Sequence, residues 1–231
     1  MARTRRSLAA LAVVVLVTGL TGCGAQDKTP SQSPAQALAR AKKLFDDASS
    51  VHLSLATGSR PTSGNAVLSA DGVGTHQPAF KGSVKVIISG LTANVPVVSL
   101  GGKVHAKLPL TIGYHVIDPE EYDAPDPADF MDPDQGISAL LTQLDKPRRT
   151  GRARSGSVIV TSYAGSLAGA AVQKIIPSAR ASSSYATTVN IDRAGRATSV
   201  HVTGPFFAGS DNVTYVLDLS DYGRDVKISA P

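Results

Sequence analysis

The chain has 231 residues, of which 42% are hydrophobic, 18% charged and 5% aromatic, and it contains no tryptophan. This composition excludes a disordered or collagen-like protein, and the length allows one domain, or at most two small ones, with a sizeable core. A single cysteine excludes an internal disulfide bond. The formal net charge of +5 at pH 7 arises from 23 basic and 18 acidic residues.

The first 22 residues have the features of a lipoprotein signal peptide. Three arginines precede an apolar run over residues 8–17, which is too short to span a bilayer comfortably but suits a signal peptide. The sequence LTGC at 20–23 matches a lipobox, in which small residues enter the signal peptidase and the thiol accepts a diacylglyceryl group. We expect cleavage before Cys23, lipidation of Cys23 and anchoring to the extracytoplasmic face of the cell membrane.

Loss of the signal peptide changes the electrostatic interpretation. Its three arginines leave with it, so 20 basic residues remain against 18 acidic ones and the mature charge is +2. That excess is too small to indicate nucleic-acid binding, which an extracytoplasmic location also disfavours.

A tether and one domain follow the lipidated cysteine. Residues 23–33 are polar after Cys23 and aperiodic, which predicts a flexible tether that reaches roughly 35 Å when extended. The domain is expected over residues 34–231. Ser33, Pro34 and Gln36 have the pattern of a capping box, and apolar residues then recur at helical spacing to Ala48.

Most of the domain has the alternation of half-buried strands. Strands are predicted near 51–55, 83–88, 95–100, 103–108, 185–191, 196–203 and 213–219, with a Gly-Gly turn at 101–102. Two further helices are predicted, one that starts with the capping pattern DPDQ at 132–135 and one over about 166–176 that Pro177 ends. Long strands joined by short turns predict an α+β fold with a large curved antiparallel sheet and helices on its concave side.

Two charge blocks allow more than one interpretation. Residues 118–134 contain eight acidic residues and no basic one, which favours a solvated loop before a helix, with calcium binding as an alternative that lacks EF-hand spacing. A basic block follows, and it either neutralises the acidic loop or contacts lipid head groups and an anionic membrane surface. Its residues are Lys146, Arg148, Arg149, Arg152 and Arg154.

Catalytic signals are missing from the sequence. Ser166 lies nearest to a nucleophile elbow, but the second glycine of G-x-S-x-G is absent at the required offset. The five histidines are scattered and form no zinc-binding pattern. We therefore expect no catalytic residue, no metal site and no cofactor.

Several segments of the domain are specific in combination, namely FKGSVKV (80–86), LTANVPVVSLGGKVHAKLP (91–109), VIDPEEYDAPDPADFMDPDQGISALL (116–141), the helix before Pro177 and VTYVLDLSDYG (213–223). Together they resemble the actinobacterial LppX/LprA/LprF/LprG lipoprotein family. The resemblance implies a half-barrel sheet with helices inside, around an apolar cavity that holds acyl chains. LolA/LolB-type carriers share this architecture.

The strand phase and the resemblance together give candidate cavity residues. Alternation places Val84, Val86 and Ile88 on one face, which is either packed core or cavity wall, and the resemblance places Val84 at the cavity mouth. Neighbouring strands should extend the lining with Val95, Val97, Val104, Ala106 and Leu108.

The sequence thus predicts a monomeric, membrane-anchored lipoprotein without enzymatic activity. It is expected to bind acylated lipids or glycolipids in the cavity and to carry or present them across the cell envelope, with a lipid exporter as a partner. One alternative is an envelope module that senses lipid or docks a transporter without carrying it. A secreted esterase is a further alternative.

Overall fold

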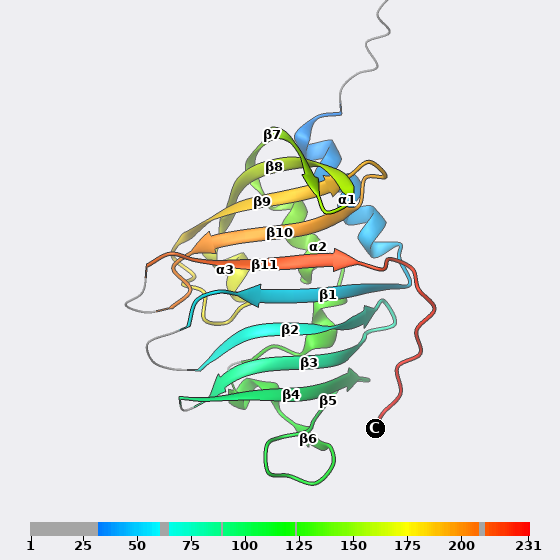
Figure 1. The fold of residues 1–231 in the computed structure, drawn as a ribbon, viewed down its shortest axis with the longest axis vertical. Coiled ribbons are helices and arrows are strands. Elements are labelled where there is room, and N and C mark those ends of the chain that lie inside the picture. The colour runs from blue at the N-terminus through cyan, green and yellow to red at the C-terminus, as the bar shows by residue number, and fades with distance from the viewer. Residues whose placement is uncertain (1–31, 61–64, 89, 123, 208–210) are drawn as a thin grey trace, which may run out of the picture. The chain divides into compact units, whose positions relative to one another are not determined.

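The domain is built on one large antiparallel sheet, which is curved and unclosed (Figure 1). The computed structural model describes residues 32–60, 65–88, 90–122, 124–207 and 211–231, so the signal peptide, Cys23 and most of the tether lie outside the described residues. The strands are β1 (Ser50–Thr57), β2 (Ala66–Thr75), β3 (Ala79–Ile88), β4 (Leu91–Leu100), β5 (Lys103–Ala106), β6 (His115–Ile117), β7 (Asp145–Ser155), β8 (Val158–Ala168), β9 (Ser184–Asp192), β10 (Ala197–Gly204) and β11 (Val213–Ser220).

The strand order places the first and the last strand at the centre of the sheet. The order is β6-β5-β4-β3-β2-β1-β11-β10-β9-β8-β7, so β1 pairs with β11 and the edges are β6 and β7. Successive strands otherwise pair in order on each side of this central pair. The α+β class and the curved sheet predicted from sequence are confirmed.

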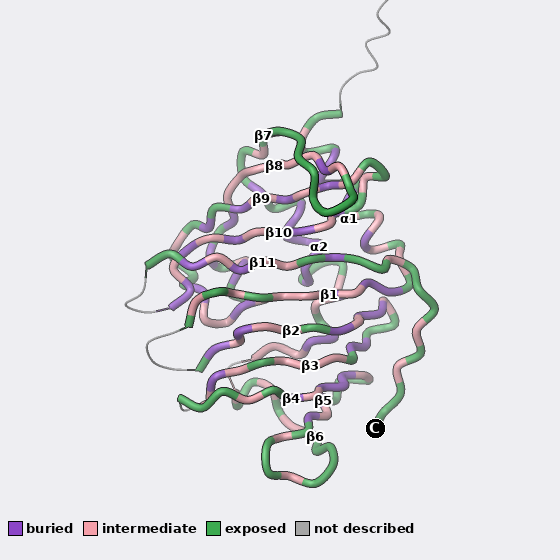
Figure 2. The backbone as a smooth tube through the Cα atoms, in the orientation of Figure 1, coloured by how far each residue is buried: buried purple, intermediate pink, exposed green. Residues whose placement is uncertain are grey.

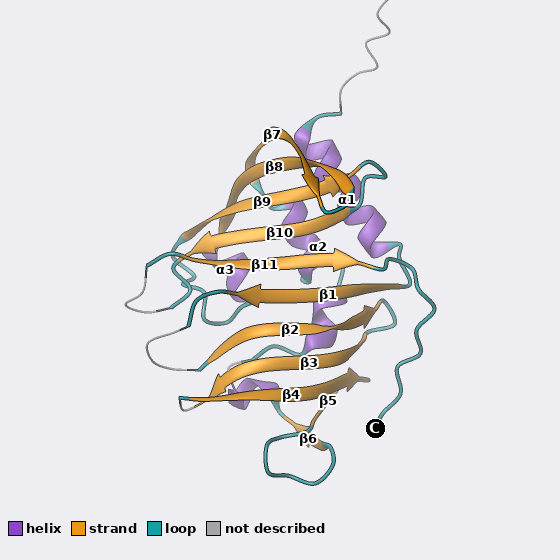
Figure 3. Cartoon of the chain, in the orientation of Figure 1, coloured by secondary structure: helices purple, strands orange, loops and turns teal. Residues whose placement is uncertain are grey.

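Helices lie on one side of the sheet, which is its concave side (Figure 3). They are α1 (Pro34–Asp46), α2 (Ile137–Thr142), α3 (Gly169–Gln173) and the 3-10 helices η1 (Pro119–Tyr122) and η2 (Pro127–Met131). The predicted capping box is confirmed, because Gln36 N donates to Ser33 Oγ at 3.2 Å and Ser33 N donates to Gln36 Oε1 at 2.9 Å. In the part of the chain that the structure describes, no helix combines the length and hydrophobicity needed to cross a bilayer.

The third predicted helix was wrong in its first turn. Strand β8 continues to Ala168, because Ser166 and Leu167 pair with Ala186 and Tyr185 of β9. Leu167 is almost fully buried in this strand, so pairing and burial outweigh the local helical pattern. Helix α3 therefore spans only Gly169–Gln173.

The second predicted helix begins later than its sequence pattern indicated. Asp132 Oδ1 accepts from the backbone N–H of Asp134 at 2.7 Å and of Gln135 at 2.9 Å, which caps a separate turn. Helix α2 starts at Ile137, after Gly136, and has no side-chain cap. A Cβ at Gly136 would lie 2.5 Å from the carbonyl oxygen of Asp132, so the close turn requires glycine there.

The main core lies between α1, α2 and the strands on either side of the central pair. Leu38 and Phe45 of α1, Leu141 of α2 and Val189 of β9 are almost fully buried in one cluster. Figure 2 shows buried positions recurring along β9, β10 and β11. Burying one such side chain stabilises the fold by about 1.5–3 kcal/mol. The described residues of this core all belong to the unit Gln32–Pro231.

A polar network joins helices α1 and α2 at the edge of this core. Lys42 Nζ and Asp46 Oδ2 form an ion pair of 2.6 Å on α1, and Ser138 Oγ of α2 donates to Asp46 Oδ1 at 2.6 Å. Ser138 is fully buried, and its hydroxyl is satisfied by this bond. The network therefore holds α2 in place over the sheet.

Candidate functional site

An apolar pocket of about 260 Å³ lies on the concave side of β1–β5. Two segments cover it, residues 117–130 around η1 and η2, and residues 175–178 after α3. None of the described residues that line it carries a charge, and the polar side chains among them are Asn65, Tyr122 and Ser178. The pocket therefore offers a ligand mainly apolar contact.

The wall formed by the sheet follows from strand register. Val84 of β3 pairs with Ala70 of β2 and Val95 of β4, so three small or branched apolar residues lie side by side on one face. Beside them, Gly82 pairs with Gly72, and a Cβ on either would lie under 3.0 Å from the Phe80 ring. These two glycines let the Phe80 ring lie close to the sheet at the end of the pocket.

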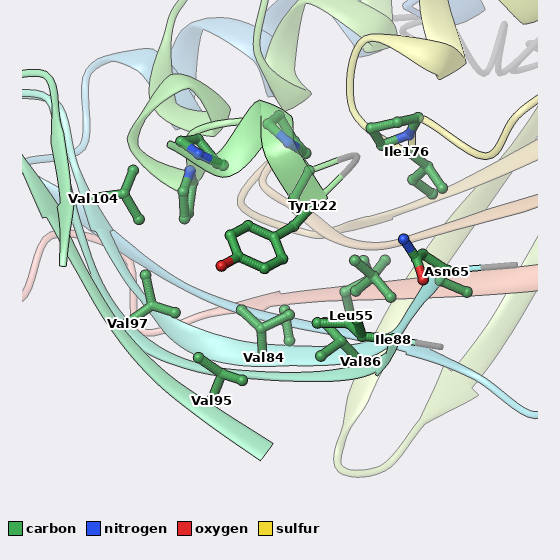
Figure 4. A pocket seen from close by; sticks show the side chains of 18 of the residues that line it. Leu55, Asn65, Val84, Val86, Ile88, Val95, Val97, Val104, Tyr122 and Ile176 are labelled. Carbon is green, nitrogen blue, oxygen red and sulfur yellow. The ribbon is translucent and has the colours of Figure 1, made fainter. Parts of the chain in front are cut away.

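The opposite wall is an irregular segment rich in proline. Figure 4 shows the Tyr122 ring of η1 extending into the pocket, toward Val84 and Val97 on the strands. The Tyr122 side chain is half-buried and fills the middle of the pocket. Tyr122 therefore limits the space available to a ligand.

The covering segment is attached to the sheet by a side-chain cap. Asp126 Oδ1 accepts from Ala128 N at 2.8 Å, at the start of η2, and from the Ser99 hydroxyl of β4. Met131, at the end of η2, is buried against Gly74 of β2, where a Cβ would lie 2.5 Å from the Met131 sulfur. The cover thus has two fixed points on the sheet, on β4 and on β2.

A buried tyrosine ties the central strands beside the pocket. The Tyr215 hydroxyl of β11 donates to the carbonyl oxygen of Val67 of β2 at 2.6 Å, across the intervening β1. Burial raises the pKa of Tyr215, with Ser178 acting in the opposite direction by hydrogen bonding. The phenol therefore remains a protonated donor throughout the physiological pH range.

The structure brings together most of the predicted lining residues. Seven of the eight lie on the pocket wall, namely Val84, Val86, Ile88, Val95, Val97, Val104 and Leu108. Ala106 does not line the pocket, because its methyl group is fully buried in a small cluster with Val95, Val97 and Val104. A methyl group is too short to reach past these larger neighbours.

Sequence reasoning missed the cover of the pocket. Tyr122 and Phe130 line it from within the acidic block, and Ile176 lines it from the segment after α3. The sequence feature that could have predicted this cover is the set of apolar residues that lie between the carboxylates of the acidic block. None of the described acidic residues of this block lines the pocket.

The carboxylates of the acidic block serve local structure. Asp118, Asp126 and Asp132 each accept a backbone N–H two residues later in the chain. Desolvation, followed by the nearby charges of Asp126 and Asp132, raises the pKa of Asp129. Among the described residues, no group of acidic, histidine or cysteine side chains is arranged to hold a metal ion.

The basic block lies away from the apolar pocket. It forms edge strand β7, where the side chains of Lys146, Arg148, Arg149, Arg152 and Arg154 are not buried. In the part of the chain that the structure describes, these residues form no ion pair with the acidic block, and Lys146 lies 4.0 Å from its neighbour Asp145. Arg152 borders a second, more polar pocket with Arg40 and Arg193.

Ser166 lies on β8 and hydrogen-bonds no histidine among the described residues. The two Ser–His contacts that the structure shows are weak ones of 3.4 Å, between Ser199 and His201 and between Ser220 and His52. A hydrolytic site needs a nucleophile, a base and an orienting group within hydrogen-bond reach. The described residues offer no such arrangement around Ser166.

An unclosed antiparallel sheet that curves around an apolar pocket defines a half-barrel protein with its site on the concave face. Helices and an irregular cover complete that site. The chain belongs to the LppX_LprAFG lipoprotein family, whose model matches residues 33–228. The family resemblance of the sequence is thereby confirmed.

Solved structures agree with this assignment at the level of the fold. The crystal structure of LprF from Mycobacterium bovis is 20% identical over 86% of this chain and 96% of its own, with a TM-score of 0.71. LppX from Mycobacterium tuberculosis is 18% identical over 85% of this chain and 98% of its own, with a TM-score of 0.62. A LolA superfamily protein from Nitrosomonas europaea is 10% identical over 84% of this chain and 95% of its own, and its TM-score of 0.29 supports no structural argument. A comparison with curated protein sequences found no match.

Proposed function

We propose that the protein is a membrane-anchored lipoprotein that binds acylated lipids or glycolipids and carries or presents them across the cell envelope. The observation that carries this proposal is the pocket lined by uncharged residues on the concave face. Each methylene group removed from water contributes about 0.8 kcal/mol, so an acyl chain binds there without polar partners. Membership of a lipoprotein family supports the same function.

The size of the pocket bears on how such a ligand is held. Its volume of about 260 Å³ lies slightly below the roughly 300–1,000 Å³ of small-molecule sites. A long acyl chain therefore requires the Tyr122 ring to move out of the middle of the pocket. The head group of the lipid remains at the rim, where solvent reaches it.

The variant Val84→Trp tests whether this face binds ligand. In a packed core the added bulk costs about 1–3 kcal/mol, whereas in an open pocket the indole occupies ligand space and stability changes little. We expect an unchanged melting temperature and a loss of copurifying lipid, measured by organic extraction and native mass spectrometry of protein from its own host. A matched control is Val158→Trp, on the exposed start of β8, which should alter neither quantity.

Two results contradict the proposal. A Val84→Trp protein that melts much lower than wild type indicates packed core rather than pocket. A variant that retains as much lipid as wild type shows that the ligand binds elsewhere. If the protein binds lipid but does not exchange it between vesicles, an envelope module is favoured over a carrier. If the protein hydrolyses ester substrates and loses this activity when Ser166 is substituted, an esterase is favoured.

The membrane anchor is a separate part of the proposal. Residues 1–22 are the signal peptide, Cys23 carries the acyl chains, residues 24–33 form the tether, and 34–231 form the lipid-binding domain. The variant Cys23→Ala should lose detergent-phase partitioning after cleavage, or remain unprocessed. Retention of a cleaved Ala variant in the detergent phase contradicts lipidation at this residue.

A further inference from the structure

The connection between β5 and β6 exposes an unusual group of apolar side chains. Six large hydrophobic residues are exposed among the described residues, and four of them lie within residues 110–116: Leu110, Ile112 and Tyr114 of this connection and Val116 of β6. The side chains of Leu110 and Ile112 are almost completely accessible, at 107% and 97%. Scattered exposed apolar residues need no explanation, but a contiguous group indicates an interaction site.

The exposed conformation is held by hydrogen bonds within the loop. Thr111 N and Thr111 Oγ1 both donate to the carbonyl oxygen of Leu108, at 3.3 and 2.8 Å, and His115 Nε2 lies 3.2 Å from the carbonyl oxygen of Ile112. Leu110 has a φ of 66°, in the left-handed region that a leucine rarely adopts. Such strain persists where function favours it, and here it directs an apolar side chain into solvent.

The loop is continuous with the pocket. Leu108, at its start, and Ile117, at its end, both line the pocket, and Tyr122 follows five residues later. In Figure 1 the loop lies below β5 and β6, at the edge of the sheet that carries the pocket, while the start of α1 lies at the other end of the domain. Whatever binds the loop is therefore brought to the pocket.

A lipid bilayer is the partner that these features fit. Four side chains on one loop bury far less than the roughly 1,200–2,000 Å² of a stable protein interface, which argues against a second copy of the chain. Lys103 and Lys107 are exposed beside the loop and form no ion pair in the described part of the chain. Apolar residues flanked by lysine, with a tyrosine between them, suit the boundary between acyl chains and head groups.

We propose that residues 107–116 insert into a lipid bilayer and thereby place the pocket at the membrane surface, where acyl chains enter or leave it. This inference rests on the proposed lipid-carrier function. It adds the surface by which the domain contacts its source or target membrane, separately from the anchor on Cys23.

The absence of tryptophan allows a direct test. The chain from Gly24 to Pro231 contains the whole unit Gln32–Pro231 and lacks Cys23, so its binding to vesicles does not depend on the anchor. Ile112→Trp then carries the only indole, and Val158→Trp is the control on the β7–β8 hairpin. Each is mixed with vesicles of phosphatidylcholine, alone or with phosphatidylglycerol, in which some lipids are brominated.

We expect the emission of Ile112→Trp to shift to the blue and to be quenched by brominated lipid, while Val158→Trp keeps the emission of water-exposed indole. Quenching in both vesicle types, or only in those with phosphatidylglycerol, supports insertion. Absence of quenching of Ile112→Trp in both types overturns the proposal, including the case in which the loop binds a membrane protein instead.

A double variant separates this inference from lipid binding. Leu110→Asn with Ile112→Asn removes the apolar side chains, and asparagine tolerates the left-handed conformation at 110. We expect transfer of a fluorescent acyl lipid between vesicles to slow roughly tenfold or more, with the amount of lipid bound per protein unchanged. An unchanged transfer rate overturns the role of the loop. Absence of bound lipid from the wild-type protein contradicts the carrier function itself.

Discussion

Two regions of one sheet carry the same alternation of apolar and polar residues but differ in what covers them. Over β8–β11 and β1, helices α1 and α2 fill the concave face with large side chains such as Phe45 and Leu141. Over β3–β5 the fully buried cluster holds only three valines and one alanine, and Val84 and Val86 remain half-buried beside the pocket. The cover there is the proline-rich segment 117–130.

The difference shows that the face of a strand and the role of that face are set by separate features. Alternation decides which residues lie on the concave side. The covering segment decides whether they become core or pocket wall, because an amphipathic helix presents a continuous apolar stripe and an irregular segment does not. Side chains on the same sheet should therefore respond differently to substitution in the two regions.

The largest expected effect is in the filled region. Leu141→Ala removes a side chain that is 1% exposed and packed in the main core, so we expect the free energy of unfolding to fall by about 2–5 kcal/mol. Denaturant unfolding with an unchanged slope measures this loss. A loss below about 1 kcal/mol contradicts the distinction between a filled and an open region.

A smaller effect on stability, with a gain in binding, is expected at the cover. Tyr122→Ala removes a ring that is half-buried and fills the pocket, so stability should fall by only about 1 kcal/mol while more or longer acyl lipid copurifies. Native mass spectrometry and denaturant unfolding measure the two quantities.

The matched control is Tyr222→Ala in the filled region. The hydroxyl of Tyr222 donates to the carbonyl oxygen of Ala197 at 2.6 Å, and its ring contacts Phe45 edge-on. This substitution should destabilise the protein by about 3–5 kcal/mol and leave its lipid content unchanged. Equal effects of the two tyrosine substitutions on stability contradict the role given to Tyr122.

The smallest effect concerns Asp129 in the cover. Desolvation and the charges of Asp126 and Asp132 raise its pKa above the unfolded value, so folding favours its protonated form. The protonated carboxyl therefore contributes to the free energy of unfolding in acid, and this contribution is lost as the pH rises through the pKa of Asp129 in the folded state. Asp129→Asn should therefore raise the unfolding midpoint slightly at neutral pH and leave it unchanged in acid.

A neighbouring carboxylate provides the contrast for this pH dependence. Asp126→Ala removes the acceptor for Ala128 N and the Ser99 hydroxyl, and loss of such a cap costs about 0.5–2 kcal/mol at neutral pH.

The prediction for Asp129 is contradicted if Asp129→Asn lowers stability at neutral pH. That result indicates that the charged Asp129 carboxylate stabilises the fold, contrary to its raised pKa.

Strand alternation and the capping box of α1 were predictable because both are local patterns. Strand β2 was not predicted, since Gly72 and Gly74 weaken its propensity and their purpose, the close approach of Phe80 and Met131, depends on distant residues. Strand β7 was not predicted either. It is an exposed edge strand rich in basic residues, so its sequence lacks the alternation of apolar and polar residues that marks a half-buried strand.

The candidate site was predictable in the sheet but not in its cover. Register follows from alternation, so the valines of β3 and β4 could be placed on one face. The cover depends on how residues 117–130 return over the sheet. The path of this irregular segment produces no periodic pattern of apolar residues in the sequence from which it could be predicted. Tyr122 therefore escaped prediction although it lies in the middle of the pocket.

The pairing of the first and last strands has a consequence for the order in which the chain acquires its structure. Strands β2–β6 and β7–β10 can each form by adjacent pairing, but β11 is the element that joins them, through ladders to β1 on one side and β10 on the other. Contacts between Val213–Ser220 and Ser50–Thr57 span most of the chain, so they form late and close a long loop. A chain synthesised from its N-terminus cannot complete the sheet until Val213–Ser220 is available. Until then β1 and β10 have no strand between them, and the apolar concave face is exposed to aggregation during that interval.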